Sequence, residues 1–182
     1  MDKMFKNGHA EEAPPIREGE EYIINSLLGV LIRCRKETVA ITVDIRHMFY
    51  CFLVQDDHRN SLRFLWFRNN NIYTDVVEYR MKVHVFGNSP SPAVATYGLR
   101  RTAREGEKEF GSDVRQFIET DFYVDDGLKS LYNDKDAISL IRRTQQMLAA
   151  SNLKLHNIAS NCPTVLEAFP EEDRAKDLRI LT

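Results

Sequence analysis

Three aspartates have positions in the sequence from which their carboxylates could act together. Asp44 ends the β-branched run "TVAITVD", and Asp125 and Asp126 follow an aromatic run in "DFYVDDG". Neighbouring carboxylates raise the energy of the ionised pair unless a cation is present. If all three meet at the rim of one sheet, they suit two divalent cations about 4 Å apart, an arrangement used for in-line phosphoryl transfer. Magnesium is the expected ion because it prefers hard oxygen ligands, and manganese is a possible substitute.

The segment around Asp125 also has a purely structural interpretation. Asp-Gly between two apolar runs is a strong hairpin signal, so residues 117–124 are predicted to form one strand and residues 128–131 a second. Asp125 would then stand at the apex of the hairpin. A turn needs only one aspartate, and the second carboxylate favours a metal site. The local sequence leaves both interpretations open.

The elements that would position these carboxylates follow from the apolar spacing and the turn signals. A strand covers residues 38–44, and Pro92 falls in the first turn of a helix. The other predicted elements are a helix at 20–36, a meander of strands at 61–67 and 72–86 around "RNNN", a helix at 91–110, the hairpin, a helix at 134–152, a strand at 153–158 and the start of a helix within 167–177. This order predicts an α+β fold, in which helices pack on one face of an antiparallel sheet.

Composition narrows the class of protein. The chain has 182 residues, of which 43% are hydrophobic, and this is typical of one globular domain. No apolar run approaches the ~20 residues of a membrane span, and no signal peptide is evident. The three cysteines are far apart, which predicts reduced thiols and a cytoplasmic or nuclear location. Trp66 is predicted to lie in the core. The net charge of −2 is unusual for a protein that binds nucleic acid by itself.

Three segments resemble motifs A, B and C of reverse transcriptases, and they occur in the same order. They are "TVDIRHMF", "VFGNSPSPAVA" and "FYVDDGLKS". The phrases "LRFLWF", "EYRMKVHVFG" and "SNLKLHNIASN" are similar to the polymerase of BEL/Pao-type LTR retrotransposons. The resemblance implies a reverse transcriptase palm with partial fingers over residues 20–174. A polar tail at 1–19 and a truncated C-terminal segment at 175–182 would flank it.

The resemblance assigns metal-binding roles to four residues. Asp44 and Asp125 would bridge the metal ions, and Asp126 would be a third, less direct catalytic carboxylate. The backbone carbonyl of Ile45 would be an additional ligand.

The resemblance also implies contacts to the substrates. Phe49 would be a steric gate under the incoming sugar, with a core phenylalanine as the alternative interpretation. Tyr123 would pack near the primer end. The loop and helix start that flank the nucleotide and the template match the family at Phe86, Gly87, Ser91 and Pro92.

The implied activity is RNA-directed DNA polymerisation with two Mg²⁺ ions. Its partners would be an RNA or DNA template with a primer, deoxynucleoside triphosphates, and the fingers, thumb and RNase H of a longer polyprotein, with no membrane. One departure from the family concerns Asn157, which stands where a lysine is usual. That lysine is a candidate proton donor to pyrophosphate, so Lys154 or His156 would have to replace it.

Two alternatives to an active polymerase remain open. The chain could be a catalytically silent relic that binds nucleic acid weakly or serves as an interaction module. A palm-fold nucleotide cyclase would use the same pair of metal ions, but no glycine-rich phosphate motif precedes the hairpin. Since basic finger strands are not evident in residues 1–19, we expect the isolated chain to be inactive even with its aspartates intact.

Overall fold

The computed structural model describes residues 24–176, so the predicted tail at 1–19 and residues 177–182 lie outside the described residues. The fold is α+β, as predicted. Its elements are α2 (Leu27–Arg33), β1 (Val39–Ile45), η1 (Met48–Cys51), η2 (Asp56–Leu62), β2 (Arg63–Phe67), η3 (Arg68–Asn70), β3 (Val76–Arg80), α3 (Ser91–Phe110), α4 (Ser112–Asp121), β4 (Phe122–Tyr123), β5 (Asp126–Leu131), α5 (Asp134–Ala149), β6 (Leu155–Ser160), α6 (Pro163–Glu167) and η4 (Glu171–Asp173).

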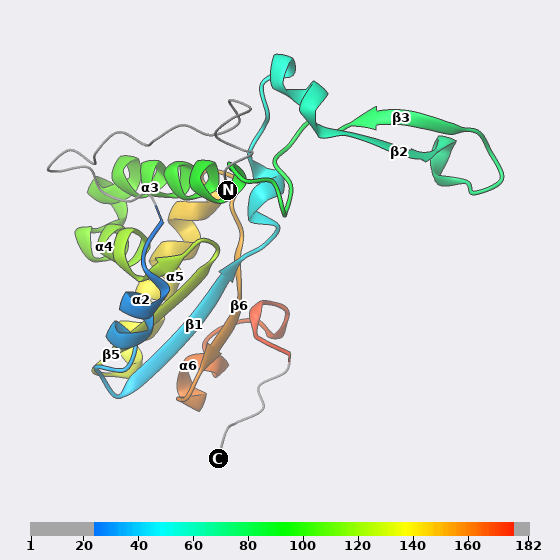
Figure 1. Ribbon diagram of the computed structural model, residues 1–182. Helices are drawn as coiled ribbons and strands as arrows, with labels where there is room; N and C mark the ends of the chain where they lie inside the picture. The colour runs from blue at the N-terminus through cyan, green and yellow to red at the C-terminus, as the bar shows by residue number, and fades with distance from the viewer. Residues whose placement is uncertain (1–23, 177–182) are drawn as a thin grey trace, which may run out of the picture.

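The main sheet has the strand order β4-β5-β1-β6, and all of its pairings are antiparallel. Helices α3, α4 and α5 gather on one side of it (Figure 1). Along β1, buried residues alternate with more exposed ones, because successive side chains point to opposite faces of a strand. The face that carries Ala40, Thr42 and Asp44 is therefore the face turned away from the core.

The hydrophobic core lies between the sheet and these helices. The strand β1 contributes Val39, Ile41, Val43 and Ile45, and the helices contribute the side chains that cover them, among them Ala95, Leu99, Val114, Phe117, Ile118, Leu140, Ile141 and Leu148. Each buried Val, Leu, Ile or Phe contributes roughly 1.5–3 kcal/mol relative to an exposed one. The floor of any site on the open face is therefore a rigid, packed strand.

Local signals fix the bounds of the two long helices. Pro92 lies in the first turn of α3, where its missing N–H leaves no bond unmade. At the start of α5, the Asn133 side chain accepts a hydrogen bond from the Asp136 N–H at 2.9 Å. This is an N-cap of the usual kind, and it fixes the first residue of α5.

The segment before the two neighbouring aspartates differs from the prediction. Residues 117–121 form the end of α4 and not a strand, and only Phe122 and Tyr123 are extended. The physical reason is that Val114, Phe117 and Ile118 have helical spacing, and all three side chains are buried. Tertiary packing on α3 thus outweighs the strand preference of the aromatic run.

The end of α4 is fixed by a buried ion pair. Asp121 is almost fully buried, and its carboxylate accepts from Lys129 at 2.5 Å and from the Arg33 Nε at 3.1 Å. These bonds connect α4 to β5 and to α2. Because a buried carboxylate without partners is costly, this arrangement fixes where the chain leaves α4 and enters the hairpin.

Strands β2 and β3 form a separate two-stranded ribbon, as the predicted meander suggested. With η2, they make an arm (residues 56–80) that projects from the body (Figure 1). The prediction that Trp66 lies in the core is wrong, since Trp66 stands on this arm and is 49% exposed. Its ring N–H donates to the Asn70 side chain at 2.9 Å.

The C-terminal part of the described chain also departs from the prediction. The helix expected to start within residues 167–177 is instead the short α6, which begins at Pro163, followed by the single turn η4. Ala175 N–H then donates to the Ile158 carbonyl at 2.9 Å, beside β6. Within residues 24–176, no helix is both long enough and apolar enough to cross a membrane.

Candidate active site

Four polar side chains stand in register across the open face of the sheet. Tyr123 pairs with Asp126 between β4 and β5, Asp126 pairs with Asp44 between β5 and β1, and Asp44 pairs with His156 between β1 and β6. Residues directly opposite each other on antiparallel strands share a face, with Cβ atoms about 4.5–5.5 Å apart. We refer to Tyr123, Asp126, Asp44 and His156 as the polar row.

Asp125 joins the polar row from the turn between β4 and β5. The turn residues are Val124 and Asp125, because Tyr123 already pairs with Asp126. The Ile45 N–H donates to the Asp125 carbonyl at 3.1 Å, and this bond fixes the turn against the end of β1. Val124 has φ of 58°, which is unfavourable for a β-branched residue. Backbone strain of this kind is characteristic of functional turns.

The glycine of "VDDG" has a role other than forming the turn. Gly127 lies inside β5, and a Cβ atom there would lie 2.6 Å from the Phe122 ring and 2.8 Å from the Val43 side chain. The glycine therefore allows close packing of the hairpin on β1. The prediction of an Asp-Gly turn is wrong by two residues, although Asp125 does stand at the tip as expected.

Burial and neighbouring carboxylates raise the pKa values of Asp44 and Asp126. Burial raises the pKa of Asp44, the Asp125 carboxylate raises it further, and His156 and His47 oppose the rise. Burial also raises the pKa of Asp126, and the carboxylates of Asp125 and Asp44 add to that rise. The site therefore concentrates negative charge, and a bound cation would relieve it.

The donor set fits a hard divalent cation by its chemistry. Asp44, Asp125 and Asp126 supply only carboxylate oxygens, which magnesium and manganese prefer. Within residues 24–176, however, no group of three or more His, Cys, Asp or Glu side chains is already arranged to hold a metal ion. Ile45 is among the residues around the cavity but has no exposed surface, so the role of its carbonyl as a ligand stays a prediction.

His156 reaches the site because β6 contains a bulge. The pairing with β1 shifts by one residue between Thr42 and Asp44, and Asn157 beside the shift has φ of 54°. Asparagine tolerates this left-handed conformation better than most residues. As a result, the Nε2 atom of His156 lies 3.8 Å from the Asp44 carboxylate. Lys154, the other residue predicted to replace the family's lysine, pairs with Asp173 at 3.0 Å.

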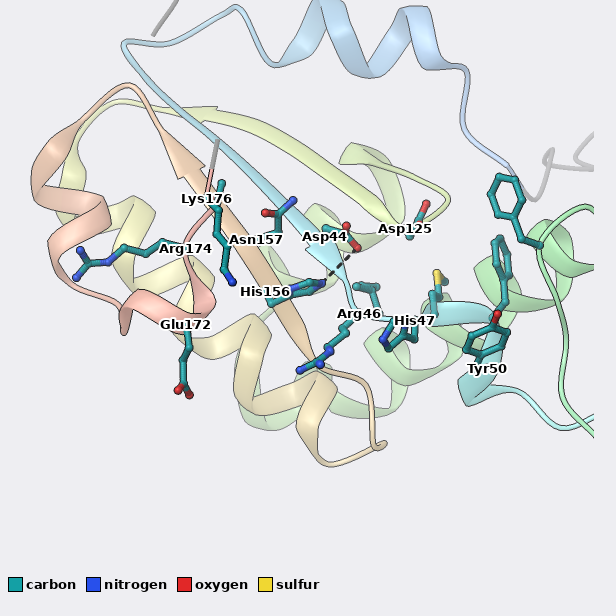
Figure 2. Close-up of a pocket in the computed structure, with 15 residues that line it drawn as sticks. Asp44, Arg46, His47, Tyr50, Asp125, His156, Asn157, Glu172, Arg174 and Lys176 are labelled. Atoms are coloured by element: carbon teal, nitrogen blue, oxygen red, sulfur yellow. Dashed lines mark ion pairs between the residues drawn. The ribbon is translucent and has the colours of Figure 1, made fainter. Parts of the chain in front are cut away.

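An open cavity of about 860 Å³ lies beside the polar row. Asp44, Asp125 and His156 line it, and Figure 2 shows Asp44 and His156 directed toward each other across the floor. Further lining side chains come from the chain after β1, from β6 itself and from the segment after β6. They include Arg46, His47, Tyr50, Asn157, Glu172, Arg174 and Lys176. Such a concave, polar space is large enough for a small organic ligand.

Two of the three predicted nucleotide-binding residues, Phe49 and Phe86, line the same cavity, and Gly87 does not. The rings of Phe49 and Phe86 meet edge to face, with centroids 6.0 Å apart. Phe49 also packs against the core, so its two interpretations, gate and core residue, are compatible. Phe86 is 86% exposed, and Gly87 beside it has φ of 84°, a conformation that requires glycine here.

The predicted primer and template residues are not all brought together. Tyr123 belongs to the polar row and is partly exposed. Ser91, however, is only 1% exposed, and its hydroxyl oxygen lies 3.1 Å from the Nδ1 atom of His84. Pro92 follows it in the first turn of α3. Ser91 therefore faces the body of the protein in this structure.

The sequence interpretation identified the three carboxylates but did not place His156. Its position opposite Asp44 depends on the bulge at Asn157, and the only local signal is an asparagine inside a strand pattern. Comparison with known proteins adds no assignment, because neither the protein-family models nor the curated proteins gave a match to this chain.

Proposed function

We propose that this chain is the palm of an RNA-directed DNA polymerase of the BEL/Pao retrotransposon type. The observation that supports the proposal most is the polar row together with Asp125. Three carboxylates from β1 and from the hairpin meet on the open face of one sheet, beside a cavity whose far rim carries Phe49 and Phe86. The order of these residues in the chain is the order of motifs A, B and C.

The proposed reaction joins the 3′-oxygen of a primer to the α-phosphorus of a deoxynucleoside triphosphate. The primer hydroxyl loses its proton, the bond from the α-phosphorus to the bridging oxygen breaks, and pyrophosphate leaves. Two Mg²⁺ ions, when bound, would stabilise the negative charge that develops on the phosphate oxygens. Asp44 and Asp125 would hold them, and Asp126 would add a third carboxylate beside Asp44.

The other residues of the cavity would orient the substrates. Phe49 comes from the chain just after β1, and its ring would lie under the sugar, where a 2′-hydroxyl would meet it. The Phe86 ring contacts the Phe49 ring edge to face and would limit its movement. Tyr123 stands next to Asp126 on the open face and would contact the primer end.

Nucleotide binding supplies a direct test. Affinity for a fluorescent deoxynucleoside triphosphate should depend on Mn²⁺, and Asp44→Asn or Asp125→Asn should abolish that dependence. Asp113→Asn is the matched control, because Asp113 pairs with Arg143 at the start of α4, outside the cavity. Binding that is indifferent to Mn²⁺, or equal in Asp44→Asn and wild type, would contradict the proposed function.

We expect the 182-residue chain to bind nucleotide without extending a primer. Its net charge is −2, and duplex binding depends mainly on cationic contacts to phosphate. The dissociation constant for a primer-template should then be no tighter than the ~10⁻⁴ to 10⁻⁶ M of non-specific contacts. Processive extension by the chain alone would show that this expectation is wrong.

A catalytically silent interaction module is the second candidate, and one observation favours it. Asn157 occupies the position of the family's usual lysine, and its left-handed conformation disfavours most other side chains. A silent module would retain its fold but would bind no nucleotide in the presence of Mn²⁺. The binding measurement above therefore separates the two candidates.

A further inference from the structure

The arm is attached to the body through two short segments that are joined by backbone hydrogen bonds. Val54 N–H donates to the Lys82 carbonyl at 2.9 Å, and His84 N–H donates to the Phe52 carbonyl at 3.0 Å. A bridge between Leu53 and Val83 lies between these two bonds. We refer to residues 52–54 and 82–84 as the root of the arm.

The root contacts α3 at two points. The Phe52 ring lies directly on Gly98, where a Cβ atom would be 2.2 Å from the ring. His84 approaches Ser91, with 3.1 Å between the imidazole Nδ1 and the hydroxyl oxygen. Ser91 and Gly98 are seven residues apart, so they lie on the same side of the helix, two turns from each other. The root therefore has two attachments along one face of α3.

The contact between His84 and Ser91 is buried. His84 is 8% exposed and Ser91 is 1% exposed, and burial lowers the pKa of His84, which favours the neutral ring. A neutral imidazole and a hydroxyl can share one hydrogen bond in either direction. A buried polar group that loses its only partner is costly, so each of the two side chains stabilises the position of the other.

The same contact closes the loop that carries Phe86 and Gly87. The loop starts after His84 and ends at Ser91, whose N–H donates to the Asn88 carbonyl at 3.0 Å. Phe86 is mostly exposed, and a side chain at Gly87 would have no neighbour within 4 Å. The loop therefore makes few contacts of its own near the cavity, and its ends determine where Phe86 stands.

We propose that His84 and Ser91 are positioning residues, whose buried hydrogen bond holds the arm on α3 and sets the Phe86 ring against Phe49 at the rim of the cavity. The part that concerns nucleotide binding rests on the proposed function, and the part that concerns the arm does not. Phe49 precedes the root by three residues and Phe86 follows it by two, so a displaced root moves both rings of the rim.

Trp66 makes the arm directly measurable, because it is the single tryptophan of the chain and lies on β2. Time-resolved anisotropy of its fluorescence reports nanosecond motion of the arm. In Ser91→Ala and in His84→Gln, the amplitude of this fast motion should rise. In His84→Asn it should stay close to wild type, because the asparagine amide places a polar atom where Nδ1 stands.

A control in the same helix separates a loss of anchoring from general destabilisation. A Cβ atom at Gly106 would lie 2.5 Å from the Met147 sulfur, far along α3 from the root. Gly106→Ala should lower the melting temperature without changing the motion of Trp66. For Ser91→Ala, Mn²⁺-supported affinity for a fluorescent deoxynucleoside triphosphate should fall about fivefold, the change expected for one hydrogen bond.

The outcomes separate this inference from the proposed function. Unchanged Trp66 motion in both Ser91→Ala and His84→Gln overturns the inference, whether or not the chain binds nucleotide. If the motion rises and wild type binds no nucleotide, the proposed function fails while the anchoring of the arm stands. If the motion rises and Ser91→Ala binds nucleotide as tightly as wild type, the pair positions the arm alone, and its assigned role at the cavity is overturned.

Discussion

Neutralising one carboxylate of the site should make the metal-free protein more stable. Asp125 is the group to change, because its charge raises the pKa values of both Asp44 and Asp126. Two unit charges about 5 Å apart repel by about 1 kcal/mol in a water-like dielectric and by about 3 kcal/mol at an effective dielectric of 20. Since these side chains are partly exposed, we take the lower figure. For a chain of this size, 1 kcal/mol corresponds to roughly 2–4 °C in melting temperature.

The divalent ion should stabilise wild type and leave the stability of the Asp125→Asn variant nearly unchanged. An ion at ten times its dissociation constant stabilises the folded state by about 1.4 kcal/mol, so wild type should gain roughly 3–6 °C. Asp125→Asn should start about 2–4 °C above metal-free wild type and gain little from the ion. Differential scanning fluorimetry in chelator and in a series of Mg²⁺ and Mn²⁺ concentrations measures both differences.

The control for this experiment is Asp113→Asn, which also removes one aspartate. Asp113 is bonded to Arg143 and lies away from the polar row, so this variant should melt lower and still respond fully to the ion. The reasoning is refuted if wild type does not respond to either ion, or if Asp125→Asn and wild type gain equally.

Three further predictions test separate features of the structure. Phe49→Val should increase binding or incorporation of ribonucleotides relative to deoxyribonucleotides by about tenfold, the scale of steric discrimination in a pocket, and an unchanged ratio would leave Phe49 with a packing role alone. Asn157→Lys should destabilise the fold by about 1–2 kcal/mol in urea denaturation because of its left-handed backbone, whereas Asn157→Gly should be close to neutral. The Arg143 hydrogen bond lowers the pKa of Asp113, although burial acts against it. The ion pair of Asp113 with Arg143 therefore stabilises the folded state fully above the ordinary pKa of 3.8, and this stabilisation disappears as the pH falls through the lower pKa of the folded state. Asp113→Asn should therefore lose less unfolding free energy than wild type between pH 5 and pH 2, as measured by urea denaturation at each pH. An equal loss in the variant and in wild type would contradict this.

Elements with strong local signals were predictable from the sequence. The helix expected at residues 91–110 is α3 with the same bounds, and the strand expected at 38–44 is β1 shifted by one residue. In both segments the periodicity of buried residues agrees with the local preference. The expected α+β class is confirmed for the same reason, because the order of these elements restricts how they can pack.

Elements whose state depends on distant contacts were not predictable. Residues 117–121 are helical because Phe117 and Ile118 have helical spacing and are buried in the core. Trp66 is exposed because β2 and β3 form a two-stranded sheet separate from the main one. An apolar strand pattern is the same whether its face is covered or not. Local preference could not distinguish these cases, since the deciding partner lies far away in the sequence.

The polar row shows that a β-bulge can change which residue lies at a position assigned from sequence spacing alone. Thr42 pairs with Ala159, so regular antiparallel pairing would put Asn157 opposite Asp44. The bulge adds one residue to β6, and His156 takes that place. An alignment of motifs therefore compares the family's lysine with Asn157, while the side chain next to the Asp44 carboxylate is His156. Because a shift of one residue exchanges the two faces of a strand, the residue available to a substrate at this position is decided by the bulge.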